Sequence, residues 1–209
     1  MTMGDESLYA AMTIPVIIGP ILERLEQEDM AAAQTLRAAF CKVEAVYKGF
    51  AFDFVKALLI KSEIYNKIEM CETLLKLEGL NDFEEFKITR PEPRFQEFNQ
   101  RAIDLKKILS KIPDQIYDRK LFLEAIKDIA NAIRLLLDSV NQVTANEVLR
   151  PDGKQTLAHR KKEFIKYSKR FSTTLKDYFK ENEKRDVFLS AAYLVDQTNL
   201  IMKAVKAVY

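Results

Sequence analysis

The sequence predicts an all-α protein in which several short helices precede an up-and-down four-helix bundle. Three observations support this prediction. Apolar residues recur every three or four positions over most of the chain, which is the period of an amphipathic helix. Turn signals divide the second half of the chain into four long segments. The composition, 48% hydrophobic and 31% charged over 209 residues, is typical of a soluble, folded protein.

The first 70 residues are expected to form short helices. Their most apolar stretch, residues 10–22, is interrupted by Pro15 and Pro20 and is too short to span a bilayer. We therefore expect one or two helical pieces over residues 8–28, and neither a membrane span nor a signal peptide. Further helices are expected over residues 30–47, ending near Gly49, and over residues 52–67.

The helix expected over residues 30–47 has an apolar face. Alanines beside that face would let a second helix backbone approach closely. A helix built on the high propensity of alanine would look the same, so the pattern alone leaves an interface open. A segment of this size also buries little surface by itself and commonly needs a partner chain. The face consists of Leu36, Ala39, Phe40 and Val43.

Charge and proline together predict a domain boundary. Residues 1–90 carry 10 basic and 15 acidic side chains, whereas residues 91–209 carry 23 and 16. The change coincides with Pro91 and Pro93, which would end a helix arriving from upstream. We therefore expect the N-terminal domain over residues 1–70 and a linker over residues 71–92, with a last helical turn or two near its start. The bundle would then cover residues 93–209.

Four apolar stripes with helical spacing follow this boundary. The first helix is expected to end at Pro113, the second to cover residues 117–148, the third residues 156–180, and the fourth the chain from about Arg185. A turn is expected at residues 150–153. Short connections between four such helices favour an up-and-down bundle. The stripes are Phe95, Phe98, Ala102, Leu105, Leu109 and Ile112, then Phe122, Ile126, Ile129, Ile133, Leu136, Val140 and Val143, then Phe164, Ser168, Phe171, Leu175 and Tyr178, then Val187, Ala191, Leu194, Ile201, Val205 and Val208.

Residues suited to catalysis are scarce. His159 is the single histidine and precedes three basic residues, so a solvated side chain is the stronger interpretation. Cys41 and Cys71 lack a metal-binding spacing and fit a reducing, cytoplasmic compartment. The sequence contains no nucleotide-binding, zinc-protease or EF-hand motif. We therefore expect a protein without catalytic, metal-binding or cofactor-binding residues.

Basic residues form two straight rows on the second and third bundle helices. Lys120, Lys127 and Arg134 recur every seven residues. If the two helices are antiparallel neighbours, the rows flank the groove between them. Such a groove suits an amphipathic helix with leucines on one face and carboxylates at its borders. Lysines beside an apolar seam are also ordinary solubilising residues, and the pattern alone favours that alternative. The other row is Lys162, Lys169 and Lys176, and the small groove residues are Ala130 and Ser172.

Other anionic partners fit the basic residues less well. The net charge of +7 over residues 91–209 is spread among 16 acidic side chains, which disfavours a nucleic-acid partner. The dense cationic run from Arg160 to Arg170 could meet phosphoinositide headgroups. A peripheral membrane module therefore remains the alternative function.

Six separated blocks of the sequence match one family in the same order. The blocks are residues 32–40 (AAQTLRAAF), 90–93 (RPEP), 108–114 (ILSKIPD), 126–130 (IKDIA), 161–169 and 197–201 (QTNLI). They resemble the programmed cell death protein 10 family, also known as the cerebral cavernous malformation 3 protein family. The resemblance covers nearly the whole chain and is strongest from Arg90 onward.

The resemblance implies a non-enzymatic adaptor with an N-terminal helical dimerisation domain and a bundle similar to the focal-adhesion-targeting domain. The N-terminal domain would form homodimers, or exchange that partner for the tail of a germinal centre kinase of the third subgroup. The assembly would join striatin-phosphatase complexes. The positions that match the family's dimerisation face are Leu36 and Ala39, with Leu58 and Leu59 as further counterparts.

The resemblance also implies a role for the basic groove. The family's bundle binds leucine- and aspartate-rich helices, as in paxillin and the cerebral cavernous malformation 2 protein. Arg134 stands where the family usually has Lys, and a guanidinium prefers planar, bidentate carboxylate contacts. A cytoplasmic protein with peripheral association to the Golgi and the plasma membrane is implied as well. The matching positions are Lys127, Arg134, Lys169, Ser172 and Lys176.

Overall fold

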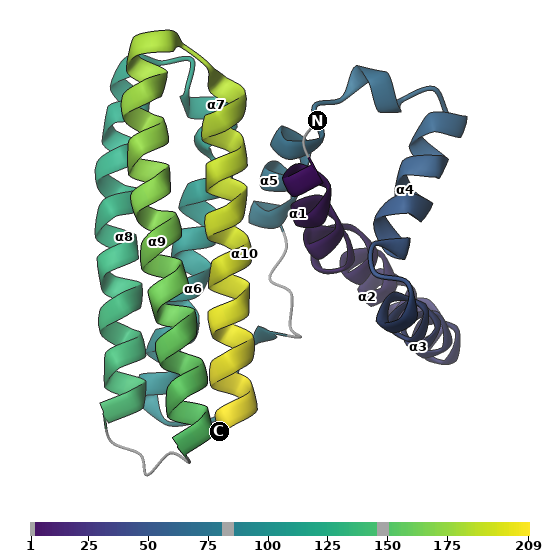
Figure 1. Cartoon of the computed structure of the whole chain (residues 1–209). Helices are drawn as coiled ribbons and strands as arrows, with labels where there is room; N and C mark the ends of the chain where they lie inside the picture. The colour runs from purple at the N-terminus through teal and green to yellow at the C-terminus, as the bar shows by residue number, and fades with distance from the viewer. Residues whose placement is uncertain (1–2, 81–85, 146–150) are drawn as a thin grey trace.

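The computed structural model describes residues 3–80, 86–145 and 151–209 (Figure 1). Every regular element within these ranges is a helix, which confirms the predicted all-α class. Four long helices form an upright bundle, and the N-terminal helices lie to one side of it (Figure 1).

The N-terminal run is helical throughout, so the break expected at its prolines was wrong. α1 (Met3–Thr13) and α2 (Gly19–Glu28) are joined by a π-helical segment, η1 (Ile14–Ile18). Pro15 and Pro20 each stand in the first turn of their element. The wider π turn keeps the chain helical where a proline would clash with the preceding turn.

This continuous run is also longer than the apolar stretch considered from the sequence. Glu6–Glu28 has 23 residues, and its most apolar window has a mean hydropathy of 1.4, so the run is long and apolar enough to cross a membrane. However, 56% of its most apolar window is buried within the protein. A buried core helix meets the same criteria, and the burial of this run fits that role.

Two further helices complete the N-terminal unit, and both have identifiable starts. α3 (Met30–Val46) begins where the Asp29 side chain accepts a hydrogen bond of 2.9 Å from the Ala32 amide. α4 (Phe50–Lys61) begins after Gly49, whose φ is 93°. The Glu44 carboxylate accepts from the amides of Gly49 and Ala51, and thereby caps α4. α4 ends six residues before the expected end, and a short 3-10 turn, η2 (Tyr65–Lys67), follows.

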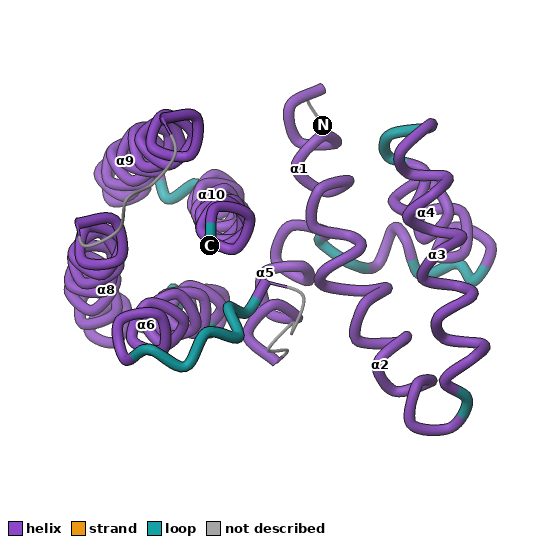
Figure 2. The backbone as a smooth tube through the Cα atoms, turned by 90° about the horizontal axis from the view of Figure 1, so that it is seen from below, coloured by secondary structure: helices purple, strands orange, loops and turns teal. Residues whose placement is uncertain are grey.

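Helix α5 (Met70–Leu80) occupies much of the range predicted as linker and packs against α6 and α10 (Figure 2). Glu78 of α5 and Lys106 of α6 form an ion pair of 2.8 Å, with both side chains only 4% exposed. After the gap at residues 81–85, the buried Asn99 amide exchanges two hydrogen bonds with the backbone of Ile88. Most of residues 70–92 is therefore attached to the bundle rather than free of it.

The bundle has the expected up-and-down order. Most of the predicted stripe residues are buried, as the bundle core requires, whereas Ile126, Ile133, Ser168, Tyr178 and Val208 are half-buried. We expected a turn at residues 150–153. Residues 151–153 instead form the first turn of α9, so the prediction was wrong there. Residue 150 lies outside the described residues. Proline is well suited to a first helical turn, because its missing amide has no intrahelical partner there. The helices are α6 (Pro93–Ser110), the short α7 (Ile112–Gln115), α8 (Arg119–Ala145), α9 (Pro151–Glu181) and α10 (Lys184–Val208).

The four long helices pack in two close pairs. α6 lies against α8, and α9 lies against α10 along most of their lengths, whereas α8 and α9 approach each other at few positions. The surface between α8 and α9 has one pocket near each end of the pair, and we call the strip of surface that joins these two pockets the channel.

Candidate protein-interaction sites

Contacts at both ends set the register of α8 against α9. At one end the Phe122 ring lies 5.4 Å from the Tyr178 ring and 6.0 Å from the Phe179 ring. At the other end Lys161 donates a hydrogen bond to Asn141. Each residue of a helix rises 1.5 Å along the axis, so the number of residues from these contacts gives the position of each side chain between α8 and α9 along the bundle axis.

The predicted basic residues form two cation pairs along this channel. Lys127 lies at nearly the same height as Lys176, and Arg134 at nearly the same height as Lys169. The two pairs are seven residues apart on each helix, or about 10 Å along the bundle axis. All four side chains are exposed. We call this surface, together with Ala130 and Ser172, the basic groove.

Helical geometry places these cations at the borders of the channel rather than inside it. On α8 the half-buried Ile126 and Ile133 lie between the buried core stripe and the cations. On α9 the Ser168 and Ser172 hydroxyls donate to carbonyls of their own helix, at 2.8 and 3.1 Å. Because these hydroxyls are already bonded within the helix, the floor is small and mostly apolar. The four predicted cations therefore lie on either side of a strip that contains Ile126, Ile133 and the two serines.

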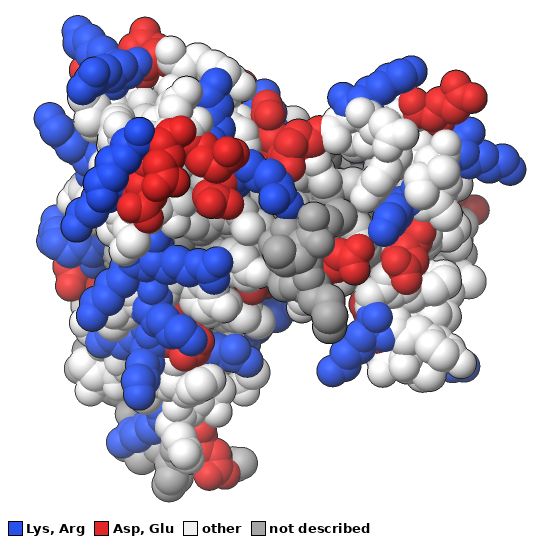
Figure 3. All heavy atoms as spheres, turned by 45° about the horizontal axis from the view of Figure 1, so that its top comes forward, with Lys and Arg blue, Asp and Glu red and all other residues white. Residues whose placement is uncertain are grey.

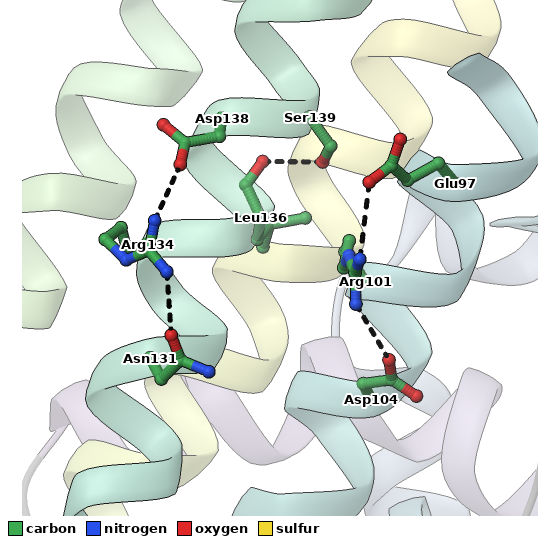
Figure 4. Close-up of polar contacts among 8 residues, drawn as sticks. All are labelled: Glu97, Arg101, Asp104, Asn131, Arg134, Leu136, Asp138 and Ser139. Carbon is green, nitrogen blue, oxygen red and sulfur yellow. Dashed lines mark hydrogen bonds and ion pairs between the residues drawn. The ribbon is translucent and has the colours of Figure 1, made fainter.

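The cations differ in their own contacts. Lys127, Lys169 and Lys176 form no ion pair with another described residue. Arg134 instead donates to Asp138 at 3.3 Å and to Asn131 at 2.9 Å, both on α8 (Figure 4). Lys and Arg side chains gather along the bundle in the space-filling view (Figure 3). The groove thus offers three uncompensated ammonium groups and one guanidinium that already has partners.

A second candidate surface lies on α3 and α4. Of the fifteen exposed large hydrophobic side chains among the described residues, ten fall between Ile21 and Ile64. Leu36 is 43% exposed and Leu58 is 52% exposed, and Ala39 is exposed beside them. An exposed apolar surface of this density is typical of a protein interface.

Three of the predicted interface residues also have contacts inside the N-terminal unit. Phe40 and Leu59 pack against the small buried cluster of Ile18, Leu22 and Val55, and Val43 is half-buried. These side chains therefore support the surface as well as contributing to it.

Sequence reasoning missed two aromatic residues of this surface. Phe50 and Phe54 are 36% and 42% exposed, and their rings lie 6.2 and 5.7 Å from the Phe40 ring. The alternating phenylalanines at positions 50, 52 and 54 were a visible signal. Phe50 was outside the helix expected to begin at Phe52, and Phe54 was inside it but was not assigned to the apolar face. We call Leu36, Ala39, Phe40, Val43, Phe50, Phe54, Leu58 and Leu59 the α3–α4 surface.

The described residues offer little for catalysis. No group of three or more His, Cys, Asp or Glu side chains among them could hold a metal ion. His159 is exposed, as the sequence predicts, and Cys41 and Cys71 are free thiols.

Comparison with known proteins assigns a family to both halves of the chain. Residues 6–65 match the model of the programmed cell death protein 10 dimerisation domain, and residues 68–158 match the model of the C-terminal domain of the same protein. The chain belongs to the programmed cell death protein 10 family. The programmed cell death protein 10 homolog of Caenorhabditis elegans is 33% identical over 212 residues, covering 97% of each chain.

The matched ranges contain the α3–α4 surface and part of the basic groove. The whole α3–α4 surface lies inside the dimerisation domain of this programmed cell death protein 10 family member. The match to the C-terminal domain starts before α5 and includes the α8 side of the basic groove. A family member with a dimerisation domain and a separate helical domain has the organisation of a scaffold or adaptor.

Proposed function

We propose that this protein is a non-enzymatic, dimeric scaffold that joins protein partners through two separate surfaces. The observation that carries the proposal is the exposed apolar α3–α4 surface within a matched dimerisation domain, on a unit distinct from the basic groove. A scaffold of this kind acts by raising the effective concentration of its partners, so it needs no catalytic group.

The α3–α4 surface is proposed to form the homodimer and, in exchange, to bind the tail of a germinal centre kinase of the third subgroup. Both partners would bury the same apolar side chains, so the two complexes would exclude each other. Through this dimer the protein would join striatin-phosphatase complexes. The exposed Leu36, Ala39 and Leu58 support a surface that a second helical chain can cover.

The basic groove is proposed to bind helices rich in leucine and aspartate, such as those of the cerebral cavernous malformation 2 protein and paxillin. Leucines would cover the floor between Ile126 and Ser172, and carboxylates spaced seven residues apart would meet the two cation pairs. Three of the four cations have no ion pair among the described residues, which supports an acidic partner.

Co-expression with the C-terminal tail of such a kinase tests the first half of the proposal. Size-exclusion chromatography with light scattering would report the mass of each species. We expect a homodimer of the protein alone and a one-to-one heterodimer with the tail. A homodimer that ignores the tail would contradict kinase binding, and a monomer under all conditions would contradict dimerisation.

A peripheral phosphoinositide-binding module is the second candidate function, and one observation favours it. Along α9 the exposed Lys166 and Arg170 lie near the stacked rings of Tyr167 and Tyr193, with Arg170 5.4 Å from the Tyr193 ring centre. Cations above aromatic rings suit an anionic membrane surface. Such a protein would be cytoplasmic and associate peripherally with the Golgi and plasma membrane. Salt-sensitive co-sedimentation with phosphoinositide vesicles, lost when Lys166 and Arg170 are changed to Ala, is the expected result.

A further inference from the structure

The exposed large hydrophobic side chains of the bundle gather at one end of it. Within residues 86–145 and 151–209 they are Tyr117 (67% exposed), Leu121 (47%), Leu123 (43%) and Phe179 (46%). All four lie where α8 begins and α9 ends. A local concentration of this kind on an otherwise polar bundle points to a binding site at this end of it.

Three of these side chains line a pocket. Tyr117, Leu123 and Phe179 form its rim, and the buried Phe122 ring, packed edge-on against Tyr178, forms its floor. The Tyr178 hydroxyl donates to the Ile116 carbonyl at 3.3 Å, which holds the floor in place. Leu121, although equally exposed, does not line the pocket. We call this the end pocket.

The end pocket carries positive charge. Arg119 lines it, and no carboxylate does so among the described residues. The Lys184 ammonium lies 4.0 Å from the centre of the Tyr117 ring, close enough for a cation–π contact. A ligand with carboxylates close to a large apolar side chain would complement this lining.

The end pocket continues the basic groove. Leu123 precedes Lys127 by one helical turn on α8, and Phe179 follows Lys176 by three residues on α9. The pocket is therefore about 5 Å beyond the first cation pair, on the same side of both helices. From Leu123 to Arg134 is eleven residues, so a helix of about three turns would reach from the pocket to the second cation pair.

We propose that the end pocket takes a large apolar or aromatic side chain from the terminal turn of the acidic helix that the basic groove binds. This inference rests on the proposed function of the groove. The cation pairs recognise the charge of the partner, whereas the end pocket fixes its axial position and selects partners that carry an apolar anchor at one end. Buried apolar anchors of this kind dominate the affinity of most protein interfaces.

Isothermal titration calorimetry on the full chain tests the proposal with three synthetic helical peptides. Each has leucines every three or four positions and aspartates at seven-residue spacing. One peptide carries Phe in its first turn, one carries Phe in its last turn, and one carries Ala at both places. We expect one of the two Phe peptides to bind about tenfold more tightly than the Ala peptide, since a buried Phe ring contributes on this scale.

Two substitutions test whether the gain in affinity of the Phe peptide comes from the end pocket. Leu123→Ala removes part of the pocket rim, and Leu121→Ala is its matched control because Leu121 has similar exposure outside the pocket. We expect Leu123→Ala to reduce the advantage of the preferred Phe peptide at least threefold while leaving the Ala peptide unchanged. Leu121→Ala should leave both affinities unchanged.

The outcomes separate this inference from the function of the groove. If all three peptides bind equally, or if Leu123→Ala weakens the Phe and Ala peptides alike, the end pocket is not an anchor site, although the groove still binds acidic helices. If no peptide binds, or if binding is unaffected by reversing the charges of Lys127 and Lys169, the groove proposal falls and the end-pocket proposal falls with it.

Discussion

Arg134 and Asp138 form an ion pair of 3.3 Å on the outer side of α8, one helical turn apart. The same guanidinium donates to Asn131, so it is held along its own helix (Figure 4). A carboxylate of an acidic partner helix would compete with Asp138 for this guanidinium. The ion pair therefore competes with binding, and its side chains, 64% and 53% exposed, make it a weak competitor.

Removing this competitor should strengthen binding. Asp138→Asn would free the Arg134 guanidinium and remove a negative charge near the basic groove. We expect the affinity for an acidic, leucine-rich helical peptide to rise by about 1.5- to fivefold, because exposed ion pairs contribute roughly 0.2–1 kcal/mol. Calorimetry at low salt would measure the change. Asp128→Asn, on the side of α8 that faces α6, changes the net charge equally, and an equal gain there would contradict the local competition.

Charge reversal tests the basic groove directly. Lys127→Glu with Lys169→Glu places a carboxylate in each cation pair, and like charges facing the partner should weaken an acidic peptide more than tenfold. Both side chains are exposed, so the thermal stability of the bundle should hardly change. Lys107→Glu with Lys111→Glu, in the groove between α6 and α8, is the matched control. A similar loss with the control pair would indicate general attraction to the bundle instead of a specific groove.

The buried ion pair between Glu78 and Lys106 should be costly to break. Glu78→Gln leaves the Lys106 ammonium, 4% exposed, without its carboxylate, and a buried charge that has lost its partner costs about 3–5 kcal/mol. Urea unfolding would measure the loss. Replacing both residues, Glu78→Leu with Lys106→Met, should restore most of the stability, since a well-packed apolar pair avoids the desolvation cost.

An exposed ion pair provides the comparison. Glu163 and Lys166 form an ion pair of 3.3 Å, and the Lys166 side chain is 70% exposed. Glu163→Gln removes this ion pair. Its effect on the free energy of unfolding should stay below about 1 kcal/mol. Equal effects of Glu78→Gln and Glu163→Gln would mean that α5 is not held to the bundle by its buried pair.

Much of the fold could be predicted from the sequence because the bundle helices are strongly one-sided. The apolar stripes from Phe95 to Leu109 and from Phe122 to Val140 have the spacing of an α-helix and not that of a strand. The cations of the basic groove were predictable for the same reason, since each follows a stripe residue at fixed spacing. The continuous run through Pro15 was not predictable, because local rules treat proline as a helix breaker and tertiary packing decided otherwise.

Other features depend on contacts between distant residues. The attachment of α5 rests on Glu78 meeting Lys106, 28 positions away along the chain, and no local pattern encodes that pairing. The end pocket likewise requires the start of α8 to lie beside the end of α9. Phe40 and Leu59 pack against the buried cluster of Ile18, Leu22 and Val55, and this packing decides which side chains of the α3–α4 surface stay exposed. The helical period alone does not reveal that packing.

Acidity should affect the stability of α10 through Asp196. Burial raises the pKa of this carboxyl above its ordinary value, more than the Gln197 amide and the charges of Lys203 and Arg160 lower it. The folded state therefore binds this proton more tightly than the unfolded chain, so ionised Asp196 destabilises the fold at neutral pH. Asp196→Asn should stabilise the protein at pH 7, and this advantage should shrink as the pH falls towards about 4. Urea unfolding at both pH values measures it; an advantage that grows on acidification would reverse the assigned direction.

The α3–α4 surface should lose its partner when charges are placed in it. Leu36→Asp with Ala39→Asp would put two carboxylates into the proposed apolar contact, and burying charges without a partner is very costly. Because both side chains are exposed in the single chain, the fold itself should survive, as circular dichroism would show. Light scattering should then report a monomer, alone and with the kinase tail.

Ala38→Asp with Ala45→Asp adds the same charge to another exposed side of α3 and should leave the dimer intact. A dimer that persists with Asp at positions 36 and 39 would mean that the chain associates through a different surface.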